Sequence, residues 1–461
     1  MTGVRRLAVL LMSLGVLTFS AHSRAMDLSQ TWQLALTNDP TYQAARANYR
    51  AAVQKMPQAR ANLLPEIEGS LTGAYLDNRA TGTLGQVFEG SRSAWTLNLT
   101  QPIFNWSAIQ TYEQSKLQVA SAEIQLQLAY QDLMLRVSES YFRILALQDE
   151  LDALKAEQRS IAEQLAAAKR RFELGDATVT DALEAQARFD LTSANIIGLE
   201  NELSNAEDEL ARIIGRQPMP QTLYPLPYNV DLPAPQPNKL TAWSDQARAA
   251  NLNVVRAEIQ TRIAKYDIEI AKSGHYPSVS LTASSTSNTV GNSQVRPFYD
   301  GRTIDNTVGL TLSVPIYSGG GVSATVVEKA ELQQKSVYDL EAERRRSLQQ
   351  SRQFFNGVQA GLARIKGLEA AEKSSLSALR ANLTGYEIGV RINLDVLDAQ
   401  RQLFITKRDL AAARYNTLLT SLRLRANSGV LSESDLFAIN QLLRPPGSPG
   451  TGIMHDVKKL R

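Results

Sequence analysis

The chain has 461 residues, 43% of them hydrophobic and 7% aromatic, with a formal net charge of +3. It contains no cysteine, which excludes disulfides, a thiol nucleophile, a cysteine metal site and a lipid anchored on an N-terminal cysteine. Its three histidines lie far apart in the sequence, so neither a metal site nor a catalytic triad built on histidine is expected. The charge balance gives no indication of a nucleic-acid partner.

The first predicted element is a secretory signal peptide over residues 1–25. Two arginines precede an apolar run over residues 7–19, and Ser23-Arg24-Ala25 has the small-x-small pattern of a cleavage site. The run is too short to cross a membrane. Cleavage would remove three arginines and no acid, which leaves the mature chain with a net charge near zero. The sequence therefore predicts export from the cytoplasm, by the Sec route rather than the twin-arginine route.

Beyond this segment the chain follows one plan twice. The phrase "FELGDATVTDALEAQ" over residues 172–186 is answered by "YEIGVRINLDVLDAQ" over residues 386–400, an offset of 214 residues (386 minus 172). Between the copies lies a stretch with seven of the 17 prolines, which is typical of a linker draped along a surface. We predict a first repeat over 26–215, this linker over 216–239, a second repeat over 240–428, and a C-terminal segment over 429–461 with a disordered end.

Each repeat is predicted to contain a helical region, two strands, a very long helix, a tight turn and a further long helix. Alanine-rich stretches over residues 28–62 and 240–273 form the first helical regions. From Leu126 to Phe172 mostly apolar residues alternate four and three steps apart, which is coiled-coil spacing. A helix that begins near Asn105 would hold about 67 residues and reach roughly 100 Å. After the second turn, apolar residues step by seven: Leu397, Phe404, Ala411 and Leu418.

The four predicted strands alternate apolar residues with small polar ones, so each has one face of each kind. The alternation is clearest around Leu97 in the first repeat and Leu310 in the second. A soluble sandwich and a membrane barrel with strands of about ten residues both fit this pattern. The signal peptide, and the lack of a second predicted sheet, favour the barrel. Four strands cannot close a barrel and open edges are costly in lipid, so the chain is expected to oligomerise.

These features resemble one known family. The repeated layout, the strand ends "TQPIFNWS" and "SVPIYSGG", the segment "TVTDALEAQARFD" and above all "GYEIGVRINLDVLDAQ" are similar to those of the TolC-like outer-membrane channel-tunnels, a family of outer-membrane efflux and type I secretion proteins. The resemblance covers residues 27–440. It implies an α+β fold in which a homotrimer combines a membrane β-barrel, twelve strands from four per chain, with a long antiparallel coiled-coil helical barrel.

The resemblance also implies a location and partners. The β-barrel would lie in outer-membrane lipid of a Gram-negative cell, and the helices would extend into the periplasm. A periplasmic adaptor and an inner-membrane transporter, either ABC-type or proton-driven, would dock on the duct for type I protein secretion or multidrug efflux. The cysteine-free chain is more similar to the protein-exporting and general-purpose members than to the lipid-anchored drug-efflux ones. No catalytic residue, cofactor or metal is implied.

The two copies of the repeated phrase would form the gate of such a duct. Asp395 and Asp398, three residues apart on one helix face, match the family's constriction and would make a carboxylate ring around a threefold axis. Gly175 and Gly389 mark the hairpin tips that contact the adaptor. Five positions match the family's aperture lock: Gln164, Thr180, Asp181, Tyr386 and Arg391. Among these, Arg391 is expected to pair with Asp181 across the hairpins.

Three gate positions depart from the family's pattern. Leu383 stands at a lock position that is often acidic, Glu387 where a small polar residue is usual, and Ile392 where threonine is usual. These departures leave the detail of the lock open. One alternative is a periplasmic coiled-coil adaptor or scaffold, which explains the heptads and the export but not the strands. The second alternative is an enzyme, since paired aspartates can indicate a glycosidase. An enzyme is not expected, because a glycosidase needs two carboxylates that flank a bond, whereas Asp395 and Asp398 lie on one side of a helix.

Overall fold

The computed structural model describes residues 25–79, 87–175, 178–215, 222–291, 301–446 and 448. The predicted signal peptide up to residue 24, the start of the predicted linker and the end of the C-terminal segment lie outside the described residues. The first repeat contains, in chain order, α1 (Leu28–Asn38), α2 (Pro40–Val53), α3 (Lys55–Ala61), β1 (Glu66–Arg79), β2 (Val87–Phe104), α4 (Trp106–Glu173) and α5 (Val179–Ile214). The second contains α6 (Leu240–Ala250), α7 (Leu252–Lys272), the 3-10 turn η1 (Ser273–His275), β3 (Ser278–Gly291), β4 (Gly301–Ser313), α8 (Gly321–Glu387) and α9 (Asn393–Asn427), and α10 (Glu433–Asn440) follows.

The helical region before each pair of strands is broken where the sequence predicted one continuous stretch. Asp39 ends α1 and caps α2, because its carboxylate accepts the Tyr42 N–H (2.7 Å), and Pro40 occupies the first turn of α2. Asn251 separates α6 from α7 in the same way, since its side chain accepts two backbone N–H groups of the first turn of α7. Side-chain caps therefore set breaks that hydrophobic periodicity does not reveal.

The four strands form one antiparallel sheet in the order β1-β2-β3-β4. The register sets like residues against like, as two neighbouring rows across all four strands show: Ile67, Leu99, Ala283 and Val308 in one, and Glu68, Asn98, Ser284 and Thr307 in the other. The predicted alternation of an apolar with a polar face is therefore confirmed. The strands are longer than expected, with 13 residues in β4 and 18 in β2, whereas a membrane span alone needs about ten.

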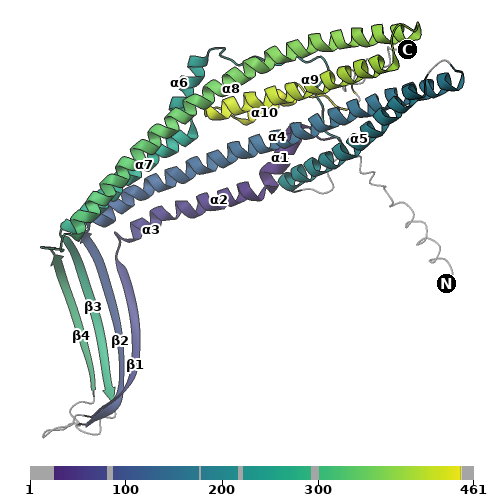
Figure 1. The fold of residues 1–461 in the computed structure, drawn as a ribbon. Helices are drawn as coiled ribbons and strands as arrows, with labels where there is room; N and C mark the ends of the chain where they lie inside the picture. Colours follow the sequence, from purple (N-terminus) through teal and green to yellow (C-terminus); the bar gives the residue numbers. More distant parts are fainter. Residues whose placement is uncertain are drawn as a thin grey trace, which may run out of the picture.

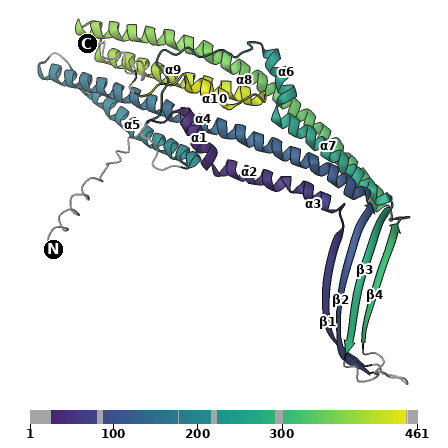
Figure 2. The same cartoon turned by 180° about the vertical axis from the view of Figure 1, so that it is seen from behind.

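The sheet projects from one end of the helical body, and among the described residues its two faces lie clear of the helices (Figure 1, Figure 2). The apolar face is consequently open in the single chain, where Leu71 is 83% and Val308 76% exposed. A soluble sandwich would cover this face, so that interpretation is excluded. Within the described residues β1 and β4 each pair with one neighbour only, which leaves both edges of the sheet open.

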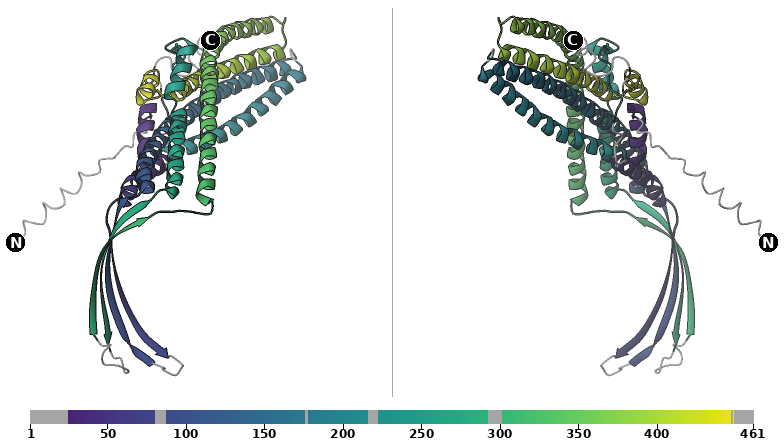
Figure 3. Two further views of the ribbon diagram at one scale, coloured as in Figure 1. Left: turned by 90° about the vertical axis from the view of Figure 1, so that its left-hand side faces the viewer. Right: turned by 90° about the vertical axis from the view of Figure 1, so that its right-hand side faces the viewer.

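Two long antiparallel helical hairpins form the frame of the body, and the shorter helices pack against them. The first contains α4, whose 68 residues reach about 100 Å, and which begins where the Asn105 side chain accepts the Ala108 N–H (3.1 Å). Both the predicted start and the predicted length of this helix are confirmed. The second hairpin contains α8, the counterpart with 67 residues. α5 packs along α4, and α9 packs along both α8 and α4, so α9 joins the two hairpins (Figure 3).

The predicted coiled-coil seam of α4 faces its neighbours over most of its length. Leu133, Val137, Ile144 and Ile161 are buried along it, whereas its last member, Phe172, is 48% exposed at the end of the hairpin. The predicted stripe on α9 is also buried: Leu397, Phe404, Ala411 and Leu418. Burial of these stripes holds the rods together side by side.

The main hydrophobic core lies where α1, α4, α5, α9 and α10 meet, and the described part of the linker enters it. Leu223 and Leu226 are buried there. The hydroxyl of Tyr141, a fully buried residue of α4, donates to the Tyr224 carbonyl (3.1 Å) and accepts the Tyr224 N–H (3.0 Å). The linker is therefore anchored in the body, not merely draped along its surface as the prolines suggested.

The C-terminal segment contributes an element that the sequence did not predict. α10 packs against α1, and its Glu433 accepts hydrogen bonds from Trp32 Nε1 (3.0 Å) and from the Tyr130 hydroxyl (2.6 Å). These bonds tie the C-terminal segment to the start of the chain and to α4. The end predicted to be disordered comprises residues 444–461; the structure describes 444–446 and 448 of it, where the Arg444 N–H donates to the Pro225 carbonyl (3.0 Å), and the rest lies outside the described residues.

The part of the chain that the structure describes contains neither a membrane-spanning helix nor a metal-binding cluster. None of its helices is both long enough and apolar enough to span a membrane. Nor do its histidine, aspartate and glutamate side chains gather in a group of three or more that would hold a metal ion. The features that point to function are the bare sheet and the charged ends of the hairpins.

Candidate functional site

Both hairpins turn at the end of the body farthest from the sheet (Figure 1). The first turn contains Gly175 and the second Gly389, with backbone φ angles of 84° and 79°. Left-handed backbone of this kind favours glycine, so these two residues are the points of reversal. Large apolar side chains stand exposed around both turns: Leu174 and Val179 at the first, and Ile388, Val390 and Ile392 at the second.

The start of each returning helix is built differently. Thr178 caps α5 in a capping box, because its hydroxyl accepts the Asp181 N–H (3.4 Å) and the Asp181 carboxylate accepts the Thr178 N–H (3.2 Å). The equivalent cap position of α9 is Ile392, which has no side-chain acceptor. Asp395, the counterpart of Asp181, is thereby released from capping, and its Oδ2 lies 3.6 Å from Arg391 Nη1.

The second aspartate of the predicted constriction has a partner on the first hairpin. Asp398 Oδ1 on α9 lies 2.6 Å from Arg188 Nη2 on α5. Packing explains this meeting, because Leu397 and Ala185 share one small buried cluster and each charged side chain follows its cluster residue within three positions. The two aspartates are therefore not an uncompensated acidic pair in the single chain, since each has an arginine beside it.

Tyr386, near the end of α8, is held by the end of α4. The guanidinium carbon of Arg171 lies 4.6 Å from the centre of the Tyr386 ring, which is a cation–π contact between the two hairpins. The ring also packs against a buried cluster that contains Leu379 and Val396, together with Leu383. Leu383, where the family's pattern often has an acid, therefore acts as a packing residue in this chain.

The remaining lock residues lie at the same end, but one expected contact is not made within the chain. The Asp181 carbonyl accepts a hydrogen bond from Asn393 Nδ2 (3.5 Å), while Thr180 is exposed and Gln164 is half-buried on α4. In the described part of the chain, the ion pair predicted between Arg391 and Asp181 is replaced by local partners, Asp395 for Arg391 and Thr178 for Asp181. A pairing between neighbouring copies stays a prediction.

Two arginines of this end, Arg171 and Arg188, were not among the predicted site residues. Arg171 closes the basic run Lys169-Arg170-Arg171, and Arg188 lies inside "TVTDALEAQARFD". For Arg188 the sequence does hold a signal, because its counterpart in the second repeat is Gln402 (188 plus 214), so the cation occurs in one copy only. Neither partner follows from helix periodicity, because each lies on the other hairpin.

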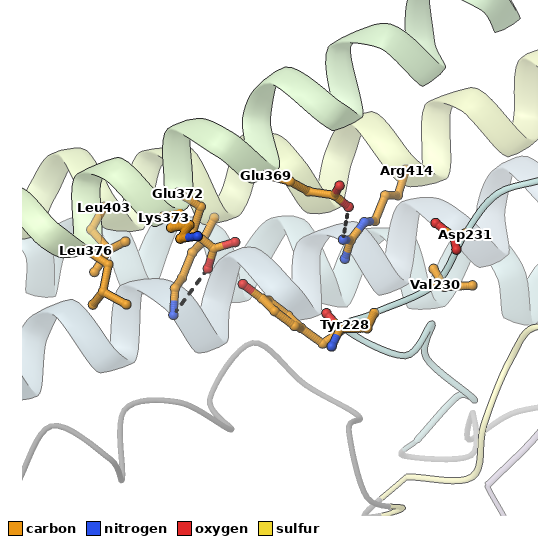
Figure 4. A pocket seen from close by; sticks show the side chains of 11 residues that line it. Tyr228, Val230, Asp231, Glu369, Glu372, Lys373, Leu376, Leu403 and Arg414 are labelled. Atoms are coloured by element: carbon orange, nitrogen blue, oxygen red, sulfur yellow. Dashed lines mark hydrogen bonds and ion pairs between the residues drawn. The ribbon is translucent and has the colours of Figure 1, made fainter.

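A second charged site lies along the second hairpin, between α8, α9 and the linker, and encloses about 430 Å³ (Figure 4). Two nearly buried cations are paired in it: Arg414 Nη2 lies 2.8 Å from Glu369 Oε1, and Lys407 Nζ lies 3.8 Å from Glu372 Oε1. The Arg414 guanidinium also lies over the ring of Tyr228, 5.6 Å from its centre. The two ion pairs join α9 to α8, and the contact with Tyr228 fastens the linker to the second hairpin.

Long coiled-coil hairpins with a charged turning end, joined to an open sheet with a bare apolar face, are the features of a membrane channel protein. The profile of one family, described as outer membrane efflux protein, matches residues 31–216 and 243–430. The match covers most of the chain in two copies. The chain therefore belongs to the outer membrane efflux protein family.

Relatives and solved structures agree with this assignment. The chain is 32% identical to the alkaline protease secretion protein AprF of Pseudomonas aeruginosa, over 94% of this chain and 90% of that protein. It is 31% identical to the outer membrane protein TolC of Escherichia coli, over 96% and 90%, and 32% identical to the proteases secretion protein PrtF of Dickeya chrysanthemi, over 95% of each. The fold is similar to that of the CmeC outer membrane channel of Campylobacter jejuni, with a TM-score of 0.76 at 16% identity over 90% of this chain and 89% of that one.

Family membership confirms several expectations from the sequence. The resemblance to TolC-like channels, the α+β class and the outer-membrane location with an extension into the periplasm are all confirmed. The chain is a transport protein and not an enzyme. The alternative of a periplasmic adaptor is excluded, because the family is one of outer-membrane channels and the bare sheet has no place in a soluble coiled coil.

Proposed function

We propose that the chain forms a homotrimeric exit duct through the outer membrane, closed at its periplasmic end until a periplasmic adaptor and an inner-membrane transporter dock on it. The observation that carries the proposal is the open four-stranded sheet. Its edge strands are matched in length, with 14 residues in β1 and 13 in β4. β4 of one copy would pair with β1 of the next around a threefold axis, and twelve strands would close the barrel that four cannot.

Closure of the sheet would also meet the demands of lipid. Each unpaired backbone group costs several kcal/mol in hydrocarbon, so two open edges would cost more than the net stability of a typical domain, about 5–15 kcal/mol. The apolar face with Leu71 and Val308 would then contact lipid. The polar face would line the interior, where the hydroxyl oxygens of Thr96 and Thr286 lie 3.3 Å apart across β2 and β3.

The hairpin ends would supply the gate. Three copies of Asp395 and Asp398 would surround the axis as its constriction, and the apolar side chains around Gly175 and Gly389 would meet the adaptor. Docking energy would shift the balance between closed and open hairpins without chemistry by the duct itself. The lock between hairpins of neighbouring copies would be made by Gln164, Thr180, Asp181, Tyr386 and Arg391.

We propose proteins as the first candidate for the cargo. AprF and PrtF carry names that refer to protease secretion, and both are 32% identical to this chain over 94% or more of its length. The transporter partner would then be the ABC type of a type I secretion system. Small-molecule efflux, with a proton-driven transporter, is the second candidate, because the cation efflux system protein CusC of Escherichia coli is 24% identical over 81% of the chain.

Planar-bilayer recording tests the duct. The purified mature protein is expected to migrate as a detergent-stable trimer and to form small cation-selective pores. Replacement of both Asp395 and Asp398 by Asn should weaken the cation preference and relieve block by multivalent cations added from the periplasmic side. A wild-type protein that forms no pore would refute the channel. A double variant with unchanged selectivity and block would remove only these aspartates from the constriction.

Deletion of the gene tests the cargo. Loss of proteins from the culture medium, with drug tolerance unchanged, is the result expected for type I secretion. Loss of drug tolerance with a normal secreted set would favour small-molecule efflux instead. Complementation of the deletion strain with the Asp395 and Asp398 double variant on a plasmid is the matched control, because this variant alters the aperture and leaves the rods and the sheet intact.

A further inference from the structure

We infer that Arg188 is a latch and a selectivity-setting residue of the aperture: it fastens the second hairpin to the first through Asp398 and offsets part of the negative charge of the constriction. This inference rests on the proposed channel function. It adds a residue of α5 to a gate whose predicted constriction lies wholly on α9.

The geometry of the pair is that of a strong contact in a wet site. Arg188 Nη2 lies 2.6 Å from Asp398 Oδ1, and the side chains are 28% and 56% exposed. Hydrogen bonds between two ionised groups are shorter and stronger than those between neutral groups. The backbone beneath the pair is firm, because Ala185 and Leu397 are both buried in the cluster that joins α4, α5 and α9. The two side chains are therefore held where they meet.

Comparison of the two repeats shows that the pair is asymmetric. The counterpart of Asp398 in the first repeat is Glu184 (398 minus 214), so an acid occurs in both copies. The counterpart of Arg188 is Gln402, whose amide donates within its own helix to the Thr406 hydroxyl (3.4 Å). Only α5 carries the cation, and it reaches across to α9. The asymmetry places the cation on the first hairpin and its acid on the predicted constriction.

The pair has two consequences for a pore. The first is electrostatic: without the guanidinium, each copy of the constriction would gain one uncompensated negative charge, and three copies would gain three. The second is mechanical, because the pair joins the hairpins of one copy and must stretch or break when they part. A half-exposed ion pair changes such an equilibrium by about two- to fivefold per copy.

Three variants separate these two consequences in planar bilayers, with lanthanum(III) as the blocking probe. Arg188→Gln should raise both the single-pore conductance and the cation preference, and should lower the half-blocking lanthanum concentration by about fivefold or more. Arg188→Lys keeps the charge and should keep wild-type selectivity. Arg188→Gln with Asp398→Asn should return selectivity and lanthanum block to wild type, because the net charge is restored, while the conductance stays high because the latch is absent.

The matched control is Arg423→Gln. Arg423 Nη2 on α9 lies 3.3 Å from Glu139 Oε2 on α4, and the two side chains are 40% and 54% exposed. This is a similar ion pair between the hairpins, but Arg423 lies 34 residues beyond the turn glycine Gly389 (423 minus 389). This variant should leave conductance, selectivity and block unchanged.

The outcomes distinguish this inference from the channel proposal. If wild type forms no pore, the channel proposal itself fails and the inference fails with it. If wild type conducts and Arg188→Gln conducts with unchanged selectivity and lanthanum block, the channel stands and Arg188 has no part in its gate. If Arg188→Gln and Arg188→Lys both fail to form detergent-stable trimers, Arg188 is a structural residue and the inference is overturned.

Discussion

At the residue scale, one missing hydroxyl decides what the carboxylate of Asp395 contacts. Asp181 and Asp395 occupy equivalent positions in the two repeats, three residues after a helix cap. Thr178 engages Asp181 in a capping box, whereas Ile392 offers nothing to Asp395. The acid on the second hairpin is therefore available to Arg391 and, in the proposed duct, to the aperture, while the acid on the first hairpin bonds within its own helix.

Replacement of Ile392 by Thr should recreate the capping box at the start of α9. The new hydroxyl would accept the Asp395 N–H, and the carboxylate would turn from Arg391 to the N–H of residue 392. We expect about 1 kcal/mol of added stability for the first turn of α9, measured as slower amide hydrogen exchange over residues 393–396. Ile392→Val is the control, because valine matches threonine in shape but cannot cap. Equal exchange in both variants would contradict this assignment.

Removal of the lock side chains should change gating and leave folding intact. Arg391→Ser deletes the cation, and Tyr386→Phe deletes the hydroxyl while it keeps the ring on which Arg171 lies. Each exposed or half-exposed contact contributes about 0–1 kcal/mol, so the double variant should conduct more in bilayers than either single variant. The detergent stability of the trimer should match wild type. Wild-type conductance would refute the lock, and failure to trimerise would show that these residues are structural.

At the element scale, α9 is the helix on which the hairpins depend, because it packs against α4 as well as α8. Tyr415 stacks on Phe142 of α4, with ring centres 5.9 Å apart, and its hydroxyl donates to Asp149 Oδ2 (2.8 Å). The pKa of Asp149 is raised to about 7, because burial and the nearby charge of Asp152 outweigh the hydrogen bond from Tyr415 and the charge of Arg414, which both lower it. A titrating carboxyl therefore lies in the joint between the two repeats.

The raised pKa of Asp149 predicts a pH dependence with a definite sign. The folded state holds the proton more tightly than the unfolded state, so stability is highest below about pH 4 and falls as the pH rises toward 7. Asp149→Asn stays neutral and still accepts from Tyr415. The free energy of unfolding of this variant, relative to that of wild type, should therefore rise by on the order of 2 kcal/mol from pH 5 to pH 8. Thermal unfolding in detergent at the two pH values measures this gain.

The control for that measurement is Asp245→Asn, which alters an exposed acid on α6. Its difference from wild type should be the same at pH 5 and pH 8. An equal result for Asp149→Asn, with no growth in the difference as pH rises, would show that the carboxyl is already ionised in the folded state at pH 5.

Local signals and distant contacts differ in how far the sequence reveals them. The bounds of α4 follow from Asn105 and the heptads, because caps and periodicity are written in neighbouring residues. The faces of the strands follow from alternation in the same way. Arg188 and Asp398 lie 210 residues apart (398 minus 188), and their meeting depends on how α5 aligns with α9, which no local pattern fixes. The docking of α10 and the burial of Leu223 are likewise results of tertiary packing.

At the scale of the whole molecule, the chain is divided into a helical body with a buried core of its own and a sheet whose apolar face is exposed. The hairpins bury their apolar stripes against one another, and the linker and α10 close the core around Tyr141 and Trp32. The sheet has no such cover among the described residues, and its apolar face is among the most exposed parts of the chain. In the proposed trimer this cover would come from outside the single chain, from neighbouring copies at the edges of the sheet and from lipid on its apolar face.

This dependence on lipid gives a test in which one strand supplies both the variant and its control. Val308 and Thr307 are neighbours at the middle of β4, and their side chains lie on opposite faces of the sheet. In the single chain both are exposed, so an arginine at either place would cost little in water. If the apolar face contacts hydrocarbon, Val308→Arg should cost about 2–4 kcal/mol, whereas Thr307→Arg should be tolerated in a wet interior. Recovery of detergent-stable trimer from the outer membrane should fall sharply for the first variant and remain near wild type for the second. Equal recovery of the two variants would show that the apolar face does not contact lipid, and with it the twelve-stranded barrel would have to be abandoned.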